Sequence, residues 1–122
     1  MSGQGENPAR PPPGTLLCSL ADLRDPGAKG FRFRHERSLF AGFIIRQSDQ
    51  VAGYVDACPH NGWPLALMDD RYLTKNGDRI ICAAHGAMFR PLDGLCVAGP
   101  CASEHLTPWP VIVVDNEVRT AG

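Results

Sequence analysis

Two short segments, each pairing a cysteine with a histidine, constrain this chain more than any other feature. The first holds Cys58 and His60 in a Cys-x-His spacing, and the second holds Cys82 and His85 in a Cys-x-x-His spacing. Each pair lies beside Pro or Gly residues, which favour tight loops. The sequence therefore predicts two loops of similar design that bring four nitrogen and sulfur ligands together.

Four such ligands fit two kinds of metal site. One is a structural zinc bound by two cysteines and two histidines. The other is a [2Fe–2S] centre with two thiolates on one iron and two imidazoles on the other. Zinc sites usually take two cysteines from one knuckle and two histidines from a helix, whereas each loop here offers one of each. The spacing favours the iron–sulfur centre but leaves zinc, or cysteines that merely pack in the core, as alternatives.

Net charge and hydrophobicity argue against a nucleic-acid-binding, membrane or secreted protein. The net charge of −1 gives no basic face of the size that nucleic-acid binding requires. No run approaches the roughly 20 apolar residues of a membrane span, and the N-terminal residues lack the features of a secretory signal. We therefore expect a cytoplasmic protein. In a reducing compartment the five cysteines are better explained as metal ligands and core residues than as disulfides.

Short apolar runs separated by turn signals indicate an all-β fold. Hairpin turns are expected at Asn76-Gly77 and Asp93-Gly94, because both sequences favour tight turns. The runs 39–46 and 51–55 are expected to pair as a hairpin through the polar residues 47–50, and Asp115-Asn116 is expected to form a further turn. No segment predicts a helix longer than a turn or two. The expected strands are residues 15–20, 30–33, 39–46, 51–55, 111–114 and 118–119.

The distribution of Pro residues and apolar runs predicts the domain organisation. Residues 1–13 are rich in Pro and are expected to form a disordered tail. Residues 14–122 are expected to form a single domain. In it, segments 15–57 and 102–120 would build an antiparallel sandwich or barrel, and a loop-rich subdomain at about 58–101 would bind the cofactor.

The residues around both loops resemble the Rieske [2Fe–2S] domain family. The resemblance covers about residues 15–120, and it implies one cluster per chain, with Cys58 and Cys82 on the buried iron and His60 and His85 on the exposed iron. It also places Gly99-Pro100 on a loop that covers the cluster. The matching positions are Cys58, His60, Gly62, Pro64, Leu65, Cys82, His85, Gly86, Phe89, Gly99 and Pro100.

Four positions indicate a branch of this family. High-potential members carry a disulfide at the positions of Trp63 and Ala84, and hydroxyl groups at those of Ala87 and Phe89. Hydrogen bonds to cluster sulfurs raise the potential, so their loss predicts the low end of the Rieske range, about −150 mV. The resemblance then implies a ferredoxin-like one-electron carrier rather than a quinol-oxidising subunit.

The implied role is to carry electrons from a reductase to an oxygenase or similar oxidoreductase. After the ligands, only His35 and His105 remain, and the chain is too short for an oxygenase's second, mononuclear iron domain, so we expect an electron-transfer component rather than a catalyst acting alone. The expected partners are redox proteins, without nucleic acid or membrane, and the chain itself is expected to be a monomer or weak oligomer. The alternatives are a small Rieske subunit of a nitrite reductase and a structural zinc module that binds other proteins.

The remaining cysteines and histidines have plainer explanations. Cys96 and Cys101 are expected to pack as small buried side chains beneath the loops, with a redox pair or an extra ligand as the alternative. Cys18 is expected in the core. His35 is expected in a solvated turn, and His105 is expected to be structural or at the surface.

Overall fold

The computed structural model of this chain describes residues 7–59, 64–66, 70–82, 86–101 and 103–121. Its strands form three antiparallel sheets of three strands each, with the orders β1-β9-β8, β2-β3-β4 and β5-β6-β7. Among the described residues the one helical element is the 3-10 turn η1, Leu20–Asp22, so the all-β prediction is confirmed. The strands are β1 (Leu16–Ser19), β2 (Gly27–His35), β3 (Ser38–Gln47), β4 (Gln50–Val55), β5 (Ile80–Ile81), β6 (Met88–Phe89), β7 (Cys96–Ala98), β8 (Val111–Val114) and β9 (Glu117–Thr120).

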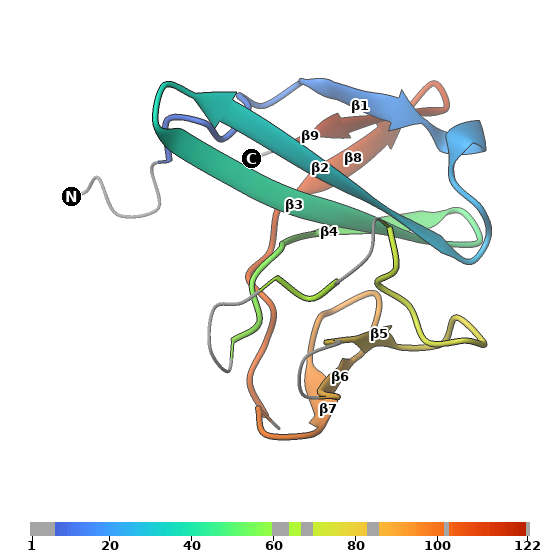
Figure 1. Ribbon diagram of the computed structural model, residues 1–122. Coiled ribbons are helices and arrows are strands. Elements are labelled where there is room, and N and C mark those ends of the chain that lie inside the picture. The colour runs from blue at the N-terminus through green and yellow to red at the C-terminus, as the bar shows by residue number, and fades with distance from the viewer. Residues whose placement is uncertain (1–6, 60–63, 67–69, 83–85, 102, 122) are drawn as a thin grey trace.

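Strand β3 separates two hydrophobic cores. Successive side chains of a strand point to opposite faces, and Phe43 and Ile45 enter one core while Phe40 and Ile44 enter the other. Figure 1 shows the β2-β3-β4 sheet between the β1-β9-β8 sheet and the smaller β5-β6-β7 sheet. Burial on both faces explains why this strand reads as a nearly continuous apolar run instead of an alternating one.

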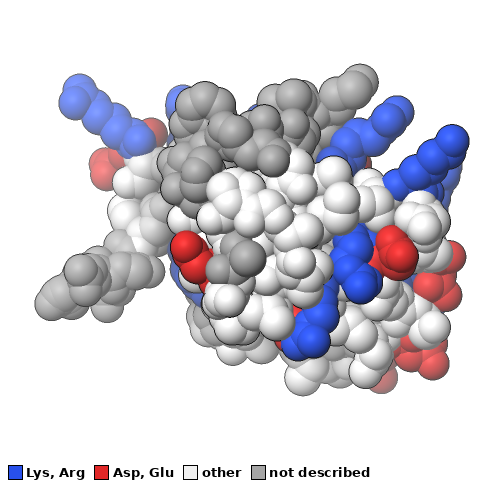
Figure 2. All heavy atoms as spheres, turned by 90° about the horizontal axis from the view of Figure 1, so that it is seen from below, with Lys and Arg blue, Asp and Glu red and all other residues white. Residues whose placement is uncertain are grey.

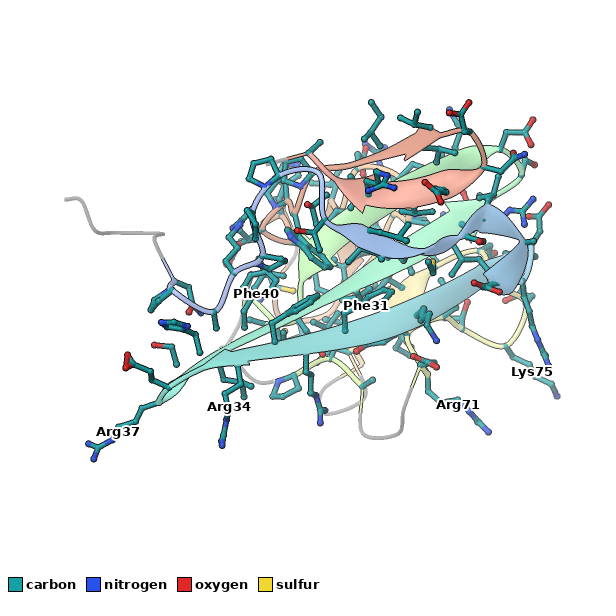
Figure 3. The ribbon with its side chains drawn as sticks, turned by 90° about the horizontal axis from the view of Figure 1, so that it is seen from above. Phe31, Arg34, Arg37, Phe40, Arg71 and Lys75 are labelled. Carbon is teal, nitrogen blue, oxygen red and sulfur yellow. The ribbon has the colours of Figure 1, made fainter. Side chains whose placement is uncertain are left out.

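The upper core, between the two larger sheets, is built around Trp109, which is fully buried. Its ring meets Phe31, Phe33 and Phe40 edge-on, with centroid distances of 6.2, 6.2 and 5.2 Å. Figure 3 shows Phe31 and Phe40 directed into the body of the protein, whereas the labelled cationic side chains extend away from it. This aromatic cluster packs the β1-β9-β8 and β2-β3-β4 sheets together, and we call these two sheets the base.

Two of the expected turns close strand pairs of the base. The expected hairpin of residues 39–46 and 51–55 is the β3–β4 pair, with Gln47 opposite Gln50. Asp115 and Asn116 both have positive φ, at 51° and 62°, which is the conformation of the hairpin turns that match strand twist. They join β8 to β9, as the sequence predicts.

The smaller β5-β6-β7 sheet lies within the segment where the cofactor-binding loops are expected. The Asn76-Gly77 turn pairs Leu73 with Ile80 through an isolated bridge. The Asp93-Gly94 turn connects β6 to β7, and Gly94 takes a φ of +75° that suits glycine. Both turns predicted here are confirmed.

Residues 7–13 contact the base, although we expected this segment to belong to a disordered tail. The Asn7 side chain donates a hydrogen bond to the Leu39 carbonyl at 2.8 Å, and Ala9 is buried in the upper core. The Arg10 guanidinium lies over the Phe40 ring, 5.4 Å from its centroid. These contacts are long-range, and the Pro-rich composition gives no local sign of them. The division at residue 13 therefore remains a prediction that these contacts do not favour.

Candidate metal centre

Cys58 follows strand β4 at the start of the first predicted ligand loop. Just after β4, the Asp56 N–H donates a hydrogen bond to the Ala41 carbonyl of β3, at 3.0 Å. The chain is therefore still attached to the sheet where the loop begins. The Asp56 carboxylate then accepts a bond from the Leu65 N–H at 2.8 Å, which ties the far end of the loop to its beginning. Cys58 lies between these two points and is only 1% exposed, so its sulfur is shielded from bulk water.

Tyr72, which lies in the core beneath β3, also binds the Asp56 carboxylate. Its hydroxyl donates a hydrogen bond to the second oxygen of Asp56 at 2.9 Å, and its ring stacks on Phe43 with a centroid distance of 4.2 Å. Burial, followed by the nearby Asp56 carboxylate, raises the pKa of the Tyr72 hydroxyl, which keeps it protonated as a donor. The first loop is thereby anchored to the central strand β3.

Cys82 begins the second predicted ligand loop, immediately after strand β5. The Gly86 N–H donates to the Cys82 carbonyl, and the Cys82 N–H donates to the Ala87 carbonyl, each at 2.8 Å. Gly86 has a φ of +72°, a conformation that most other residues avoid. These two bonds close a tight loop, and Cys82 at its root is fully buried.

The two cysteines belong to one hydrophobic core, the lower one, beneath β3. The other two predicted ligands, His60 and His85, lie outside the described residues, as do Trp63 and Ala84. Within the described residues, no group of three or more His, Cys, Asp and Glu side chains is arranged to hold a metal ion. The structure thus brings Cys58 and Cys82 into a common core, while the full ligand set remains a prediction.

A third segment packs against the second loop. Gly99 has a φ of +93°, and a Cβ atom at this position would stand 2.7 Å from the Cα of Ala87. The residue must therefore be glycine for the turn to approach the second loop this closely. Ala87 is fully buried at this contact, Phe89 is also fully buried, and neither carries a hydroxyl group.

Cys96 and Cys101 are buried in the lower core, as expected, but they also contact each other. Their sulfur atoms are 2.9 Å apart, and the Cys96 thiol also lies 3.2 Å from the Ala98 carbonyl oxygen. Burial first, then contacts with Cys96 and with Cys58, raise the pKa of the Cys101 thiol to about 12. The sequence placed both cysteines beneath the ligand loops, as the structure does, but nothing in the local pattern fixes the distance between their sulfur atoms.

The remaining predicted residues lie where the sequence placed them. Cys18 is buried in the upper core, and burial raises the pKa of its thiol. His35 is the last residue of β2, beside the exposed turn to β3, with a side chain 61% exposed. His105 is exposed and pairs its backbone with Leu95 in an isolated bridge. None of these three side chains belongs to the lower core that holds Cys58 and Cys82.

Comparison with known protein families gives a match over most of the chain. Residues 15–116 match the profile of the family described as the Rieske [2Fe–2S] domain. No curated protein is similar in sequence at a significant level.

Solved structures share the fold. A chain of the complex of reduced oxygenase and oxidised ferredoxin in carbazole 1,9a-dioxygenase is 25% identical, with a TM-score of 0.67 and coverage of 88% of this chain and 91% of that one. The ferredoxin of carbazole 1,9a-dioxygenase from Nocardioides aromaticivorans IC177 is 19% identical, with a TM-score of 0.69 over 90% of this chain and 98% of that one. The Sphingomonas yanoikuyae B1 ferredoxin is 24% identical, with a TM-score of 0.65 over 89% of this chain and 98% of that one.

Proposed function

This chain belongs to the Rieske [2Fe–2S] domain family, and on that premise we propose that it is a one-electron carrier that supplies an oxygenase. Its cofactor is the [2Fe–2S] cluster from which the family takes its description. The observation that carries the proposal is the family match over residues 15–116, which includes both Cys and His loops. The match favours the iron–sulfur centre over the zinc site that the ligand spacing alone left open.

The described residues fit such a cluster. Thiolates are the usual ligands of iron–sulfur clusters, and Cys58 and Cys82 present two buried sulfur atoms in one core. All five cysteines lie within the described residues and none is joined in a disulfide, so neither sulfur is bonded to another cysteine. We propose that these two cysteines bind one iron, and that His60 and His85 bind the other.

The cluster, when bound, takes up and releases a single electron. The chain's own residues shield its cysteine side, since Cys58 and Cys82 are buried among apolar side chains of the lower core. Ala87 and Phe89 line that core without hydroxyl groups, so two donors that would raise the potential are missing. This supports the proposal of a low-potential carrier.

The proposed partners are a reductase that gives the electron and a terminal oxygenase that receives it. The similar chain at 25% identity comes from a complex of an oxygenase with a ferredoxin, which supports this assignment. Figure 2 shows, on the face seen from below, a patch of uncharged described atoms beside the larger group of grey ones, with charged side chains both at the margin and on the face next to this patch. Such a surface suits the small interfaces of transient redox encounters.

A cytoplasmic location is part of the proposal. It is supported by the five cysteines, none of which is in a disulfide, since disulfides are rare where thiols are kept reduced. Within the described part of the chain, no helix is both long enough and apolar enough to span a bilayer.

Replacing Cys58 with serine tests the ligand assignment. Purified wild-type protein should contain iron and acid-labile sulfide at about two of each per chain, as the cluster requires. Cys58→Ser should lose most of both and its visible absorption, because a hydroxyl is a poor substitute for a thiolate on iron. Cys18→Ser is the matched control, since Cys18 is also buried but belongs to the upper core. Equal iron loss in both variants would contradict the assignment.

Electron delivery tests the function itself. Chemically reduced protein, mixed anaerobically with the oxidised terminal oxygenase component of a carbazole 1,9a-dioxygenase, should reoxidise as the oxygenase becomes reduced. Stopped-flow absorbance would follow both changes, with oxidised protein as the blank. A cluster-loaded protein that passes no electrons to this oxygenase or to any other tested would argue against an oxygenase as its partner, while leaving the cofactor assignment intact.

A further inference from the structure

The cationic side chains of this protein divide into two groups. The chain has 12 Lys and Arg residues, and all of them lie in the described ranges. The first group lies over aromatic rings, donates hydrogen bonds or forms ion pairs within the fold, and its members are Arg10, Lys29, Arg46, Arg79, Arg90 and Arg119. In the second group no side chain has a hydrogen bond or an ion pair with a described residue, and its members are Arg24, Arg32, Arg34, Arg37, Arg71 and Lys75. The second group is exposed throughout, so its charges are accessible to another molecule.

Three cations of the second group come from strand β2 and the turn that follows it. β2 is an outer strand of the β2-β3-β4 sheet. Arg32 and Arg34 lie two residues apart on it, so their side chains leave the same face of the strand, and Arg37 is in the turn to β3. The opposite face carries Phe31 and Phe33, which pack in the upper core. Arg32 and Arg34 are therefore on the side of this sheet where the lower core lies.

The other three cations reach the same strand from elsewhere in the chain. Arg24 and Arg71 line one cavity of about 440 Å³ together with the first residues of β2. Lys75 belongs to the turn that packs on Pro26, just before β2, where a Cβ at Gly77 would lie 2.5 Å from the proline ring. Figure 3 shows the cations that it labels extending from one side of the molecule. We call the six cations of the second group the basic edge.

The carboxylates around the basic edge are already engaged within the fold. Four of them accept a hydrogen bond and one, on Glu36, lies 3.9 Å from a histidine nitrogen; they are Asp22, Asp25, Glu36, Asp70 and Asp78. The aspartates hold their charge close to the backbone, whereas Arg and Lys carry theirs at the end of a long, flexible side chain. The outermost charges of this edge are therefore mainly positive, although the net charge of the whole chain is −1.

A short path of contacts joins the basic edge to the first predicted ligand loop. The Asp70 carboxylate accepts a hydrogen bond from the Gly30 N–H of β2 at 2.7 Å. Tyr72 lies against the same strand, since a Cβ at Gly30 would be 2.6 Å from its hydroxyl oxygen. That hydroxyl donates to Asp56 at 2.9 Å, two residues before Cys58. A protein docked on the basic edge would therefore stand beside the segment that leads to a proposed iron ligand.

We propose that the basic edge docks an acidic face of a redox partner protein and thereby speeds the encounter in which the electron is passed. The inference rests on the proposed function, because it gives an electron carrier its docking surface. Opposite surface charges raise association rates by about 10- to 1,000-fold, and salt screens the effect. Charged residues on an outer strand can also serve only to prevent pairing with another edge, and that use predicts no effect on electron transfer.

Electron transfer to two haem proteins of opposite surface charge tests the proposal. Reduced, cluster-loaded protein is mixed anaerobically with ferric cytochrome b5, which is acidic, or with ferric cytochrome c, which is basic. Stopped-flow absorbance follows the single electron that leaves the cluster and reduces the haem iron. With wild-type protein the rate constant for cytochrome b5 should fall as ionic strength rises, because salt screens the attraction. Arg32→Gln/Arg34→Gln should slow this reaction by roughly 3- to 10-fold at low salt and should not slow the reaction with cytochrome c.

Two further variants control for the fold and for net charge. Arg32→Lys/Arg34→Lys keeps both charges and should keep the wild-type rate with cytochrome b5. Ile112→Glu/Val114→Glu makes the net charge as negative as Arg32→Gln/Arg34→Gln does, but on strand β8 of a different sheet, where the two side chains are 50% and 44% exposed. It should slow the reaction with cytochrome b5 less than the arginine variant does, because steering depends on where the charge is.

The outcomes separate this inference from the proposed function. Loaded Arg32→Gln/Arg34→Gln protein that reacts with cytochrome b5 at the wild-type rate would overturn the inference alone, and its self-association in analytical ultracentrifugation would show that the arginines protect the outer strand instead. Equal slowing in Ile112→Glu/Val114→Glu would also overturn it, because net charge would then explain the rate. Binding of the wild type to a random-sequence DNA duplex, without salt-dependent transfer to cytochrome b5, would replace the protein partner with nucleic acid. Wild-type protein without iron would overturn the proposed function and this inference together.

Discussion

Trp109→Ala should destabilise this protein more than any other single truncation in the upper core, by about 3–5 kcal/mol of unfolding free energy. The side chain is fully buried, and it contacts three phenylalanine rings that come from strands β2 and β3. Its indole nitrogen has no hydrogen-bond partner, so truncation removes packing and leaves no polar group unpaired. The change in the urea midpoint of the far-UV circular dichroism signal would measure the loss.

Two glycines beside Trp109 allow the reverse test, in which a methyl group is added to the packed indole instead of the indole being removed. A Cβ at Gly42 would lie 2.5 Å from an indole carbon of Trp109, and one at Gly53 would lie 2.3 Å from the Trp109 carbonyl oxygen. Gly42→Ala should therefore destabilise the fold by overpacking, by about 1–3 kcal/mol. Ile112→Ala is the control, because Ile112 is half exposed on strand β8. A loss for Trp109→Ala no greater than for Ile112→Ala would contradict the central role of the indole.

What the sequence predicts well in this protein is local. The Asn76-Gly77, Asp93-Gly94 and Asp115-Asn116 turns each form at the expected place. Their conformation depends on residues within the turn, where Gly and Asn tolerate positive φ. The β3–β4 hairpin is also local, since its strands are joined by the short turn at Gln47–Gln50.

Features that depend on distant contacts could not be predicted in the same way. Nothing near Trp109 indicates that Gly42 and Gly53 leave space for it. In the site, the Cys and His spacing pointed to Cys58 and Cys82, but the common core that Cys58 shares with Cys101 joins segments far apart in the sequence. The hydrogen bond between Tyr72 and Asp56 is of the same kind, because it depends on how the lower core folds beneath β3.

Asp56→Ala should have the second large effect, lowering both the stability of the fold and the iron content. The substitution leaves the Leu65 N–H and the Tyr72 hydroxyl without their acceptor, and each buried unpaired donor costs about 1–3 kcal/mol. Because the lost bond to Leu65 closes the loop that starts at Cys58, we also expect a fall in iron content, beyond any loss of fold. Urea unfolding and iron and sulfide analysis of the same preparations would measure the two effects separately.

Tyr72→Phe is the matched variant, because it removes one bond to Asp56 while keeping the ring stacked on Phe43. It should cost less stability than Asp56→Ala and leave the iron content near wild type, since the loop-closing bond from Leu65 remains. Asp56→Asn should fall between them, because the amide oxygen can still accept from Leu65. If Tyr72→Phe instead lost as much iron as Asp56→Ala, the anchor of the loop would be the tyrosine hydroxyl, and the bond between Asp56 and Leu65 would have no separate part in holding the cluster.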